Sequence, residues 1–195
     1  MRKLIYLAAV TIDGFIADSH RDTGFFGADP KTLNAIFAEY PETCPAHLRE
    51  VLGVDANPRH FDAVVMGYNT HRPALEAGLT SAYPHLAQYV LTHRADLPAD
   101  PTVTVVPEDP VGLVRDLKQQ PGRDIWLCGG ADVAAQLAGE IDEYHLKVNP
   151  VLIGAGIPLL GRSVAPIHLD LGHTRVLPAG VQLSVYRRHQ PPANH

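Results

Sequence analysis

The stretch IWLCGGADVAAQL at residues 125–137 reads as an apolar strand, a Gly-Gly turn and a helix in immediate succession. Paired glycines at such a turn let the backbone approach a ligand closely, and the free N–H groups at the start of a helix attract phosphate. The same residues would also serve as a tight connection with no ligand, because Gly-Gly is a weaker signal than a full GxGxxG pattern. The stretch therefore predicts a strand–turn–helix unit of an α/β fold and leaves its ligand open.

Two further turns of this kind follow apolar runs elsewhere in the chain. One spans Gly67–Thr70, where the Thr70 hydroxyl suits either a helix cap or a contact with phosphate. The other spans Thr92–Arg94, where the Arg94 guanidinium suits either a phosphate monoester or a solvated surface position. If the preceding strands are parallel, all three turns lie at the edge where α/β sheets bind ligands. Together they favour an extended phosphate-bearing ligand such as a dinucleotide.

Short apolar runs alternate with helical patterns over most of the chain. The strand candidates are Leu4–Val10, Ala63–Gly67, Gln88–Leu91, Val103–Val106, Ile125–Cys128 and Glu143–Val148. The helix candidates are Pro30–Tyr40, Ala46–Leu52, a short segment after Asn69, Pro110–Gln119 and Ala131–Leu137. Continuous apolar runs are typical of strands covered on both faces, and their alternation with helices predicts an α/β fold with a mainly parallel central sheet. The first strand leads into Thr11–Ala17 and not into GxGxxG, which excludes a standard Rossmann domain.

The last part of the chain has a different pattern. Two strand candidates near Thr174–Leu177 and Val181–Arg187 flank Pro178-Ala179-Gly180, which is a hairpin signal. We therefore expect an antiparallel hairpin at one edge of the sheet. No linker or repeat divides the chain, so residues 1–189 are predicted to form a single domain and residues 190–195 a frayed tail.

The composition of the 195 residues excludes several classes of function. The formal net charge of −5 provides no basic surface for nucleic acid. No stretch approaches the ~18 apolar residues of a membrane span. The 2 cysteines lie far apart in the sequence, which fits a reduced cytoplasmic setting, and the 11 histidines include no HxH or HExxH pattern, so we expect no metal site.

Five stretches, in the same order along the chain, resemble the dihydrofolate-reductase-like superfamily. Within it they resemble the RibD C-terminal domain family, the reductase domain of the bifunctional riboflavin-pathway deaminase-reductase. The stretches are AAVTIDGFIA at 8–17, VVMGYNT at 64–70, VLTHR at 90–94, IWLCGGADVAAQL at 125–137 and IDEYHLKVNPVLIGAGIPLLG at 141–161. The resemblance implies a mainly parallel sheet with flanking helices, NADPH laid across the strand ends, and a small heterocycle facing the nicotinamide. It also suggests a homodimer, for which the apolar segment Val148–Gly161 offers a suitable edge.

The resemblance also implies which residues contact the cofactor. Two would lie by the nicotinamide, two turns would hold the adenosine side, and the Gly-Gly turn would hold the pyrophosphate. These residues are Ala9, Ile16, Gly67, Tyr68, Asn69, Thr70, Thr92, His93, Arg94, Cys128, Gly129, Gly130, Ala131, Asp132 and Val133. Dihydrofolate reductases usually carry Arg at the position of Tyr68. Arg94 or Arg72 would have to contact the 2′-phosphate instead, which leaves NADH possible beside NADPH.

The chain also departs from the family pattern in the residue that would supply the proton. Reduction of a C=N or C=O bond needs a proton as well as a hydride. The first helix has no acid in its middle, and Cys128 stands where riboflavin-type reductases tend to place one. Asp13 and Asp29 are the remaining candidates, but Asp13 also suits hydrogen bonds to loop backbone and Asp29 also suits a helix cap. The catalytic group is therefore left unidentified.

Two functions follow from these observations. The first is an NAD(P)H-dependent reductase of a small heterocyclic substrate, such as a pterin or a pyrimidine of riboflavin biosynthesis. The alternative is a non-catalytic domain that binds a nucleotide or metabolite and retains the cofactor cleft without the chemistry. Oxidation of the cofactor by any member of a panel of heterocycles separates the two.

Overall fold

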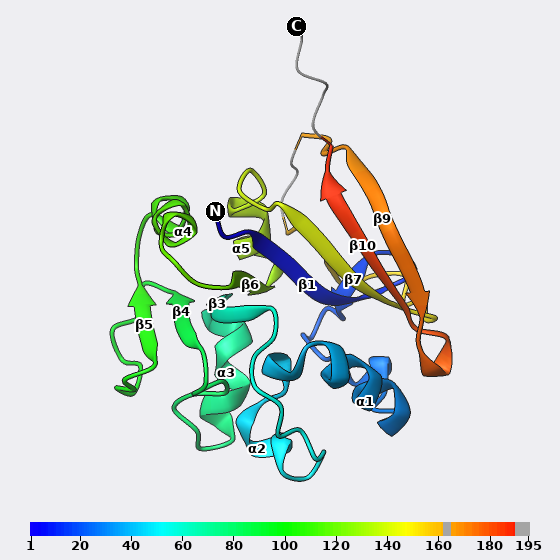
Figure 1. The fold of residues 1–195 in the computed structure, drawn as a ribbon, viewed down its shortest axis with the longest axis horizontal. Coiled ribbons are helices and arrows are strands. Elements are labelled where there is room, and N and C mark those ends of the chain that lie inside the picture. The colour runs from blue at the N-terminus through cyan, green and yellow to red at the C-terminus, as the bar shows by residue number, and fades with distance from the viewer. Residues whose placement is uncertain (162–164, 190–195) are drawn as a thin grey trace, which may run out of the picture.

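The computed structural model describes residues 1–161 and 165–189, and the predicted tail at 190–195 lies outside them. Its main sheet has eight strands in the order β5-β4-β3-β6-β1-β7-β10-β9, and β2 pairs with β8 in a small second sheet (Figure 1). The strands are β1 Leu4–Thr11, β2 Phe15–Ala17, β3 Phe61–Gly67, β4 Ala87–Leu91, β5 Val103–Val106, β6 Asp124–Gly129, β7 Glu143–Asn149, β8 Ile157–Pro158, β9 Leu169–Val176 and β10 Gln182–Arg188. The helices are α1 Pro30–Glu39, α2 Ala46–Arg49, α3 Tyr68–Glu76, α4 Pro110–Gln119 and α5 Ala131–Gln136.

The pairing of the strands confirms the predicted α/β architecture. Strands β5, β4, β3, β6, β1 and β7 are all parallel to one another. Strand β10 runs antiparallel to β7 and to β9, and the predicted hairpin turns at Pro178–Gly180. Strands β1, β3 and β6 were visible as nearly continuous apolar runs because helices cover both faces of the sheet there.

The helices begin and end close to the predicted residues, with two differences. Helix α2 ends at Arg49, three residues before the predicted Leu52. Helix α3 already begins at Tyr68, with Gly67 at its N-cap position and no side-chain cap. Thr70 therefore lies inside the first turn of α3, and the capping role that its hydroxyl suited is wrong.

Two apolar cores lie on opposite faces of the sheet. Helices α4 and α5 cover the first, which includes Tyr6 and Leu127. Helix α1 covers the second, which contains Leu7, Phe61 and Trp126. Trp126 is 5% exposed, and its indole N–H donates to the carbonyl of Leu7 at 3.2 Å, so it packs in this second core. Figure 1 shows α1, α2 and α3 below the sheet and α4 and α5 above it.

Three partly or fully buried histidines link stability to pH. Burial lowers the pKa of His71, His85 and His145 from the ordinary value of 6.5. Below about pH 6.5 the unfolded chain therefore binds more protons than the folded chain, and stability falls as the pH falls. We expect a lower melting temperature at about pH 5.5 than at about pH 7.5, by about 2–4 °C for each kcal/mol lost. A melting temperature that is unchanged or higher at the acid pH would contradict this.

Candidate functional site

The three glycine- or hydroxyl-bearing turns lie side by side at one edge of the sheet. Strand β3 is the neighbour of both β6 and β4, and Met66 is in register with Gly129 on one side and Val90 on the other. The turns that follow these three strands consequently emerge next to one another. All three stand at the carboxyl ends of parallel strands, the edge at which α/β sheets bind ligands.

The Gly-Gly turn after β6 and the Gly67–Thr70 turn after β3 are in direct contact. A Cβ atom built on Gly67 would lie 3.0 Å from the Cγ2 atom of Val133, so only glycine lets the end of β3 approach α5 this closely. Gly129 has a φ of +110°, which disfavours any other residue, and the Gly129–Gly130 peptide bond is cis. A Cβ on Gly130 would lie 3.6 Å from the hydroxyl oxygen of Thr70. Gly130 and Thr70 thus face each other across a gap that a side chain would begin to fill.

The Gly67–Thr70 turn after β3 and the Thr92–Arg94 turn after β4 are in contact through Tyr68 and Arg94. The guanidinium of Arg94 lies over the Tyr68 ring, 4.7 Å from its centroid. It also forms two hydrogen bonds to the carboxylate of Asp96, at 3.0 and 2.7 Å. Arg72 is paired as well, with its Nε atom 3.1 Å from Glu76. Each of the two arginines that could contact a 2′-phosphate therefore already has a carboxylate partner.

The remaining cofactor-binding candidates sit around this edge. Asn69 and His93 are exposed, and Thr92 is half-buried at the end of β4. Asp132 is exposed in the first turn of α5, between the buried residues Ala131 and Val133. The structure thus brings the predicted cofactor residues of β3, β4 and β6 together at one edge of the sheet.

The loop after β1 folds back over the sheet. The N–H of Gly14 donates to the carbonyl of Thr11 at 3.0 Å, and the N–H of Phe15 donates to the Thr11 hydroxyl at 2.9 Å. This turn directs β2, with Ile16 at its centre, back along β1 and onto β8. Ala9, on β1, and Ile16 are both half-buried.

The two acids considered as proton donors, Asp13 and Asp29, both accept hydrogen bonds from backbone N–H groups. The carboxylate of Asp13 accepts hydrogen bonds from the N–H groups of Ile153 and Gly154, at 3.1 and 2.7 Å. The nearby Thr11 hydroxyl and these backbone bonds hold the pKa of Asp13 below its usual range. Asp29 caps α1 by accepting from the Thr32 N–H at 2.8 Å, and its pKa is lowered mainly by the Thr32 hydroxyl. Lowered pKa values leave both groups ionised at neutral pH, in the form that cannot donate a proton.

A row of polar residues on β7, which sequence reasoning missed, lies on the face covered by α1. Glu143, His145 and Lys147 alternate along the strand and therefore point to the same side of the sheet. Their partners on β1 are Ile5, Leu7 and Ala9 in turn. The alternation of three ionisable residues in an otherwise apolar strand was the signal that would have found them.

The first two members of the row are tied into a hydrogen-bonded chain. His145 Nδ1 lies 2.9 Å from the Tyr40 hydroxyl, and its Nε2 lies 3.0 Å from the Glu143 carboxylate. The other carboxylate oxygen of Glu143 accepts from Lys3 at 2.7 Å. Burial would raise the pKa of Glu143, but the bonds from Lys3 and His145 outweigh it and hold that pKa below its usual range. Both ring nitrogens of His145 are consequently occupied.

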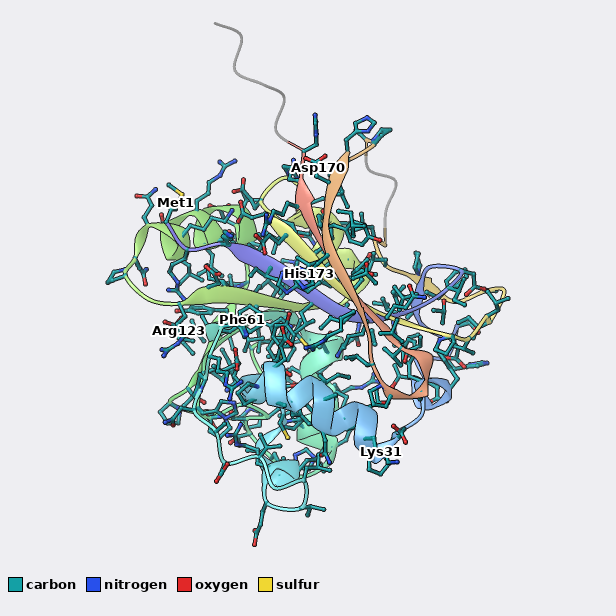
Figure 2. The ribbon with its side chains drawn as sticks, turned by 45° about the vertical axis from the view of Figure 1, so that its right-hand side comes forward. Met1, Lys31, Phe61, Arg123, Asp170 and His173 are labelled. Carbon is teal, nitrogen blue, oxygen red and sulfur yellow. The ribbon has the colours of Figure 1, made fainter. Side chains whose placement is uncertain are left out.

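Lys147 and Cys128 lie further along the same face. Burial lowers the pKa of the Lys147 ammonium, opposed by the electrostatic effect of Cys128. Burial raises the pKa of the Cys128 thiol to about 12. Figure 2 shows α1 lying across this face, with Lys31 at its start near the β9–β10 hairpin. The hydroxyl of Thr32 donates to the carbonyl of Pro178 in the hairpin turn at 2.8 Å.

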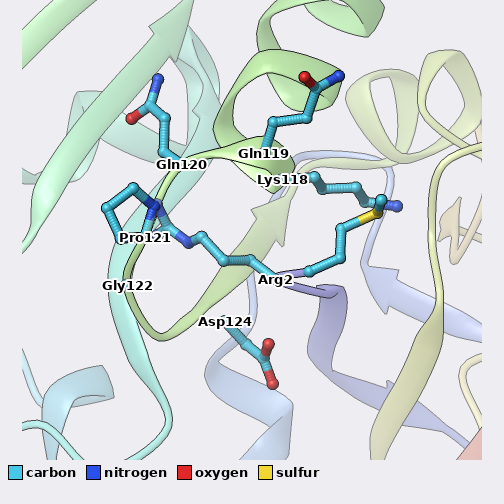
Figure 3. A pocket seen from close by; sticks show the side chains of 8 residues that line it. Arg2, Lys118, Gln119, Gln120, Pro121, Gly122 and Asp124 are labelled. Atoms are coloured by element: carbon cyan, nitrogen blue, oxygen red, sulfur yellow. The ribbon is translucent and has the colours of Figure 1, made fainter.

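An open hollow of about 590 Å³ lies at the opposite edge of the sheet, by the amino ends of β1 and β6 (Figure 3). Arg2 and Lys118 line it, but Arg2 is already paired with Asp62 and Lys118 with Asp142. Both cationic side chains that line the hollow are therefore already in ion pairs with carboxylates of the protein. The hollow also lies at the opposite end of β6 from the Gly-Gly turn. Among residues 1–161 and 165–189, no group of three or more His, Cys, Asp and Glu side chains is placed to hold a metal, and no helix is long and apolar enough to cross a membrane.

Comparisons with known proteins agree with this arrangement. A family model described as the RibD C-terminal domain matches residues 2–183. The uncharacterized protein YwjB of Bacillus subtilis (strain 168) is 27% identical over 190 residues, which cover 95% of this chain and 98% of YwjB.

Two solved structures share the fold at low identity. A protein of Shewanella sp. PV-4 that is assigned to riboflavin biosynthesis superposes with a TM-score of 0.71 at 21% identity, covering 96% of this chain and 99% of that one. A diaminohydroxyphosphoribosylaminopyrimidine deaminase/reductase of Thermotoga maritima superposes with a TM-score of 0.63 at 14% identity, covering 96% of this chain and 57% of that one. This chain therefore spans little more than half of the Thermotoga protein.

Proposed function

The chain belongs to the RibD C-terminal domain family, and from this premise we propose that it is an NAD(P)H-dependent reductase. Its substrate is a small heterocycle, such as a pterin or a pyrimidine of the kind used in riboflavin biosynthesis. The single observation that carries the proposal is the contact of three turns at the carboxyl edge of β6, β3 and β4. A ligand that spans all three must be extended, and a dinucleotide has the required length and phosphate groups.

The residues of the turns fit such a cofactor. Gly129 and Gly130 leave room for a pyrophosphate opposite the Thr70 hydroxyl, since a Cβ on Gly130 would already approach Thr70 to 3.6 Å. The first N–H groups of α5 have no partners within the helix and face the same edge. Tyr68 offers an aromatic ring, and Arg94 above it a guanidinium, to the adenosine end. When bound, the nicotinamide supplies the hydride.

The choice between NADPH and NADH depends on Arg94 in this proposal. We expect Arg94→Ala to weaken NADPH binding about 5–10-fold and to change NADH binding less than about twofold. The loss is modest because Arg94 is exposed and must give up part of its pairing with Asp96. Calorimetric titration with both cofactors measures it.

Two matched variants sharpen this test. Arg72→Ala removes the other candidate arginine, and Asp96→Asn frees Arg94 and should leave NADPH binding unchanged or tighter. Equal losses for NADPH and NADH in Arg94→Ala would contradict a contact with the 2′-phosphate.

The activity itself is tested with a panel of pterins, aminopyrimidines and quinones, by following the absorbance of the reduced nicotinamide. Steady oxidation with any member supports the reductase and rejects the non-catalytic alternative. Saturable cofactor binding with no oxidation across the panel would support the alternative.

The homodimer stays a prediction, and light scattering after size-exclusion chromatography tests it; a monomer at every concentration would refute it.

A further inference from the structure

We propose that Lys147 is the residue that donates the proton to the substrate; the inference rests on the proposed reductase function. Lys147 lies near the end of β7, in register with Ala9 on β1 and Leu183 on β10. It shares the α1 face of the sheet with Cys128. Cys128 stands just before the Gly-Gly turn, where the family resemblance leads us to expect an acidic residue. Lys147 is partly exposed, so part of its side chain is accessible from outside the protein.

The small neighbour of Lys147 on β1 leaves room for its side chain to extend across the sheet. Ala9, which the family resemblance puts beside the nicotinamide, carries only a methyl group on this face. The long lysine stem can therefore extend over β1 toward β6, which agrees with the electrostatic effect that Cys128 and Lys147 exert on each other. A substrate that faces the nicotinamide at Ala9 would consequently lie beside the Lys147 ammonium.

Lys147 differs from the other lysines of the chain in its surroundings. Lys3 is paired with Glu143 and Lys118 with Asp142, each at 2.7 Å, while Lys31 is exposed on α1. Within the described part of the chain, no carboxylate lies within ion-pair distance of the Lys147 ammonium, and burial lowers its pKa. A partly buried lysine without a counter-ion releases its proton more readily than a fully exposed one, which is the property that a general acid needs.

Most of the other ionisable groups on this face are already engaged, and the imidazole of His173, in register with Val185 on the edge strand β9, is exposed to solvent. His145 is held between Tyr40 and Glu143, and Arg175 on β9 is paired with Glu39 of α1. The Cys128 thiol keeps its proton, because its pKa is about 12. Among the described residues of β1, β6 and β7 on this face, Lys147 is therefore the charged side chain that has no hydrogen-bond or ion-pair partner.

In the proposed step, a proton from Lys147 accompanies the hydride that the substrate receives from the nicotinamide. A carbon of the substrate C=N bond accepts the hydride, and the electron pair of the π bond moves to the nitrogen. One N–H bond of the Lys147 ammonium breaks, and its proton forms the new N–H bond of the product. The nicotinamide is oxidised, the substrate is reduced, and the neutral amine regains a proton from water.

The first test needs neither cofactor nor substrate. The chain has four lysines at positions 3, 31, 118 and 147, so protein labelled with ¹³C at the lysine Cε gives a simple NMR spectrum. We expect one signal to titrate at a lower pH than the other three and to vanish in Lys147→Met. A Lys147 signal that titrates with the others would overturn the inference.

The second test measures turnover with the fastest acceptor of the heterocycle panel. Lys147→Met should lower kcat about 100-fold or more, with the Kd of NADPH unchanged within about twofold. The alkaline limb of the wild-type kcat/KM profile should follow the NMR titration and disappear in this variant. Lys31→Met, on the exposed surface of α1, should behave as wild type.

The outcomes separate the two proposals. A folded Lys147→Met protein that turns over like wild type, with the same pH profile, overturns the role of Lys147 and leaves the reductase standing. Wild-type protein that binds NADPH and reduces no acceptor overturns the proposed reductase and this inference with it.

Discussion

Gly130→Val is expected to weaken NADPH binding about 100-fold or more, equivalent to about 2.7 kcal/mol, while the protein stays folded. Gly130 has a φ of −77°, which other residues adopt, and a Cβ there makes only an ordinary contact of 3.6 Å with Thr70. A Cβ atom is therefore accommodated, and the two methyl groups that valine adds to it would occupy the gap proposed for the pyrophosphate. Quenching or enhancement of nicotinamide fluorescence on titration measures the affinity.

A matched control separates loss of binding from damage to the fold. Gly139, just beyond α5, is exposed, and a Cβ built there meets no atom within 4 Å. Gly139→Val should bind NADPH as wild type does, and circular dichroism of both variants should match wild type. A Kd for Gly130→Val within about threefold of wild type would show that the cofactor does not use this turn.

Glu42→Ala is expected to destabilise the protein by about 3 kcal/mol or more. The Glu42 carboxylate is fully buried and accepts hydrogen bonds from the N–H groups of Arg59, His60 and Phe61, at 3.1, 2.7 and 2.8 Å. These donors lie at the entry to β3, and truncation would leave the buried Phe61 N–H without an acceptor, at about 1–3 kcal/mol for an unsatisfied buried group. The partly buried N–H groups of Arg59 and His60 would lose their acceptor as well, and a cavity would replace the carboxylate. Urea unfolding measures the loss, which corresponds to a fall of roughly 6–12 °C in melting temperature.

Two further variants test this account of Glu42. Glu42→Gln keeps one acceptor oxygen and should cost clearly less than Glu42→Ala. Glu50→Ala, which truncates an exposed glutamate of the same region, should change stability by no more than about 0.5 kcal/mol. A loss below about 1 kcal/mol in Glu42→Ala would show that these hydrogen bonds are replaced by water.

The sequence predicted the parallel part of the sheet well because that part is buried on both faces. Leu4, Val64 and Ile125 are fully buried in such continuous apolar runs. The start of β9 was missed because almost every residue of that edge strand is exposed, and no apolar run marks it. Strands β2 and β8 are only three and two residues long, too short for a periodic pattern to show.

The parts of the candidate site that contain glycine turns could be predicted from the sequence. The parts that depend on contacts between distant residues could not. Gly67, Gly129 and Gly130 identified the turns, because close approach of backbones requires glycine at particular places. The stacking of Arg94 on Tyr68 joins residues of two different turns, and no local pattern encodes it. The burial of Lys147 likewise depends on which strands flank β7, although the alternation of Glu143, His145 and Lys147 pointed to their shared face.

Calorimetric titration of the wild-type protein with NADPH and NADH tests the central claim, a dinucleotide cleft across the ends of β6, β3 and β4. We expect saturable binding of one dinucleotide per chain, which Gly130→Val removes and Gly139→Val preserves. Folded protein that takes up neither NADPH nor NADH at millimolar concentration would contradict it.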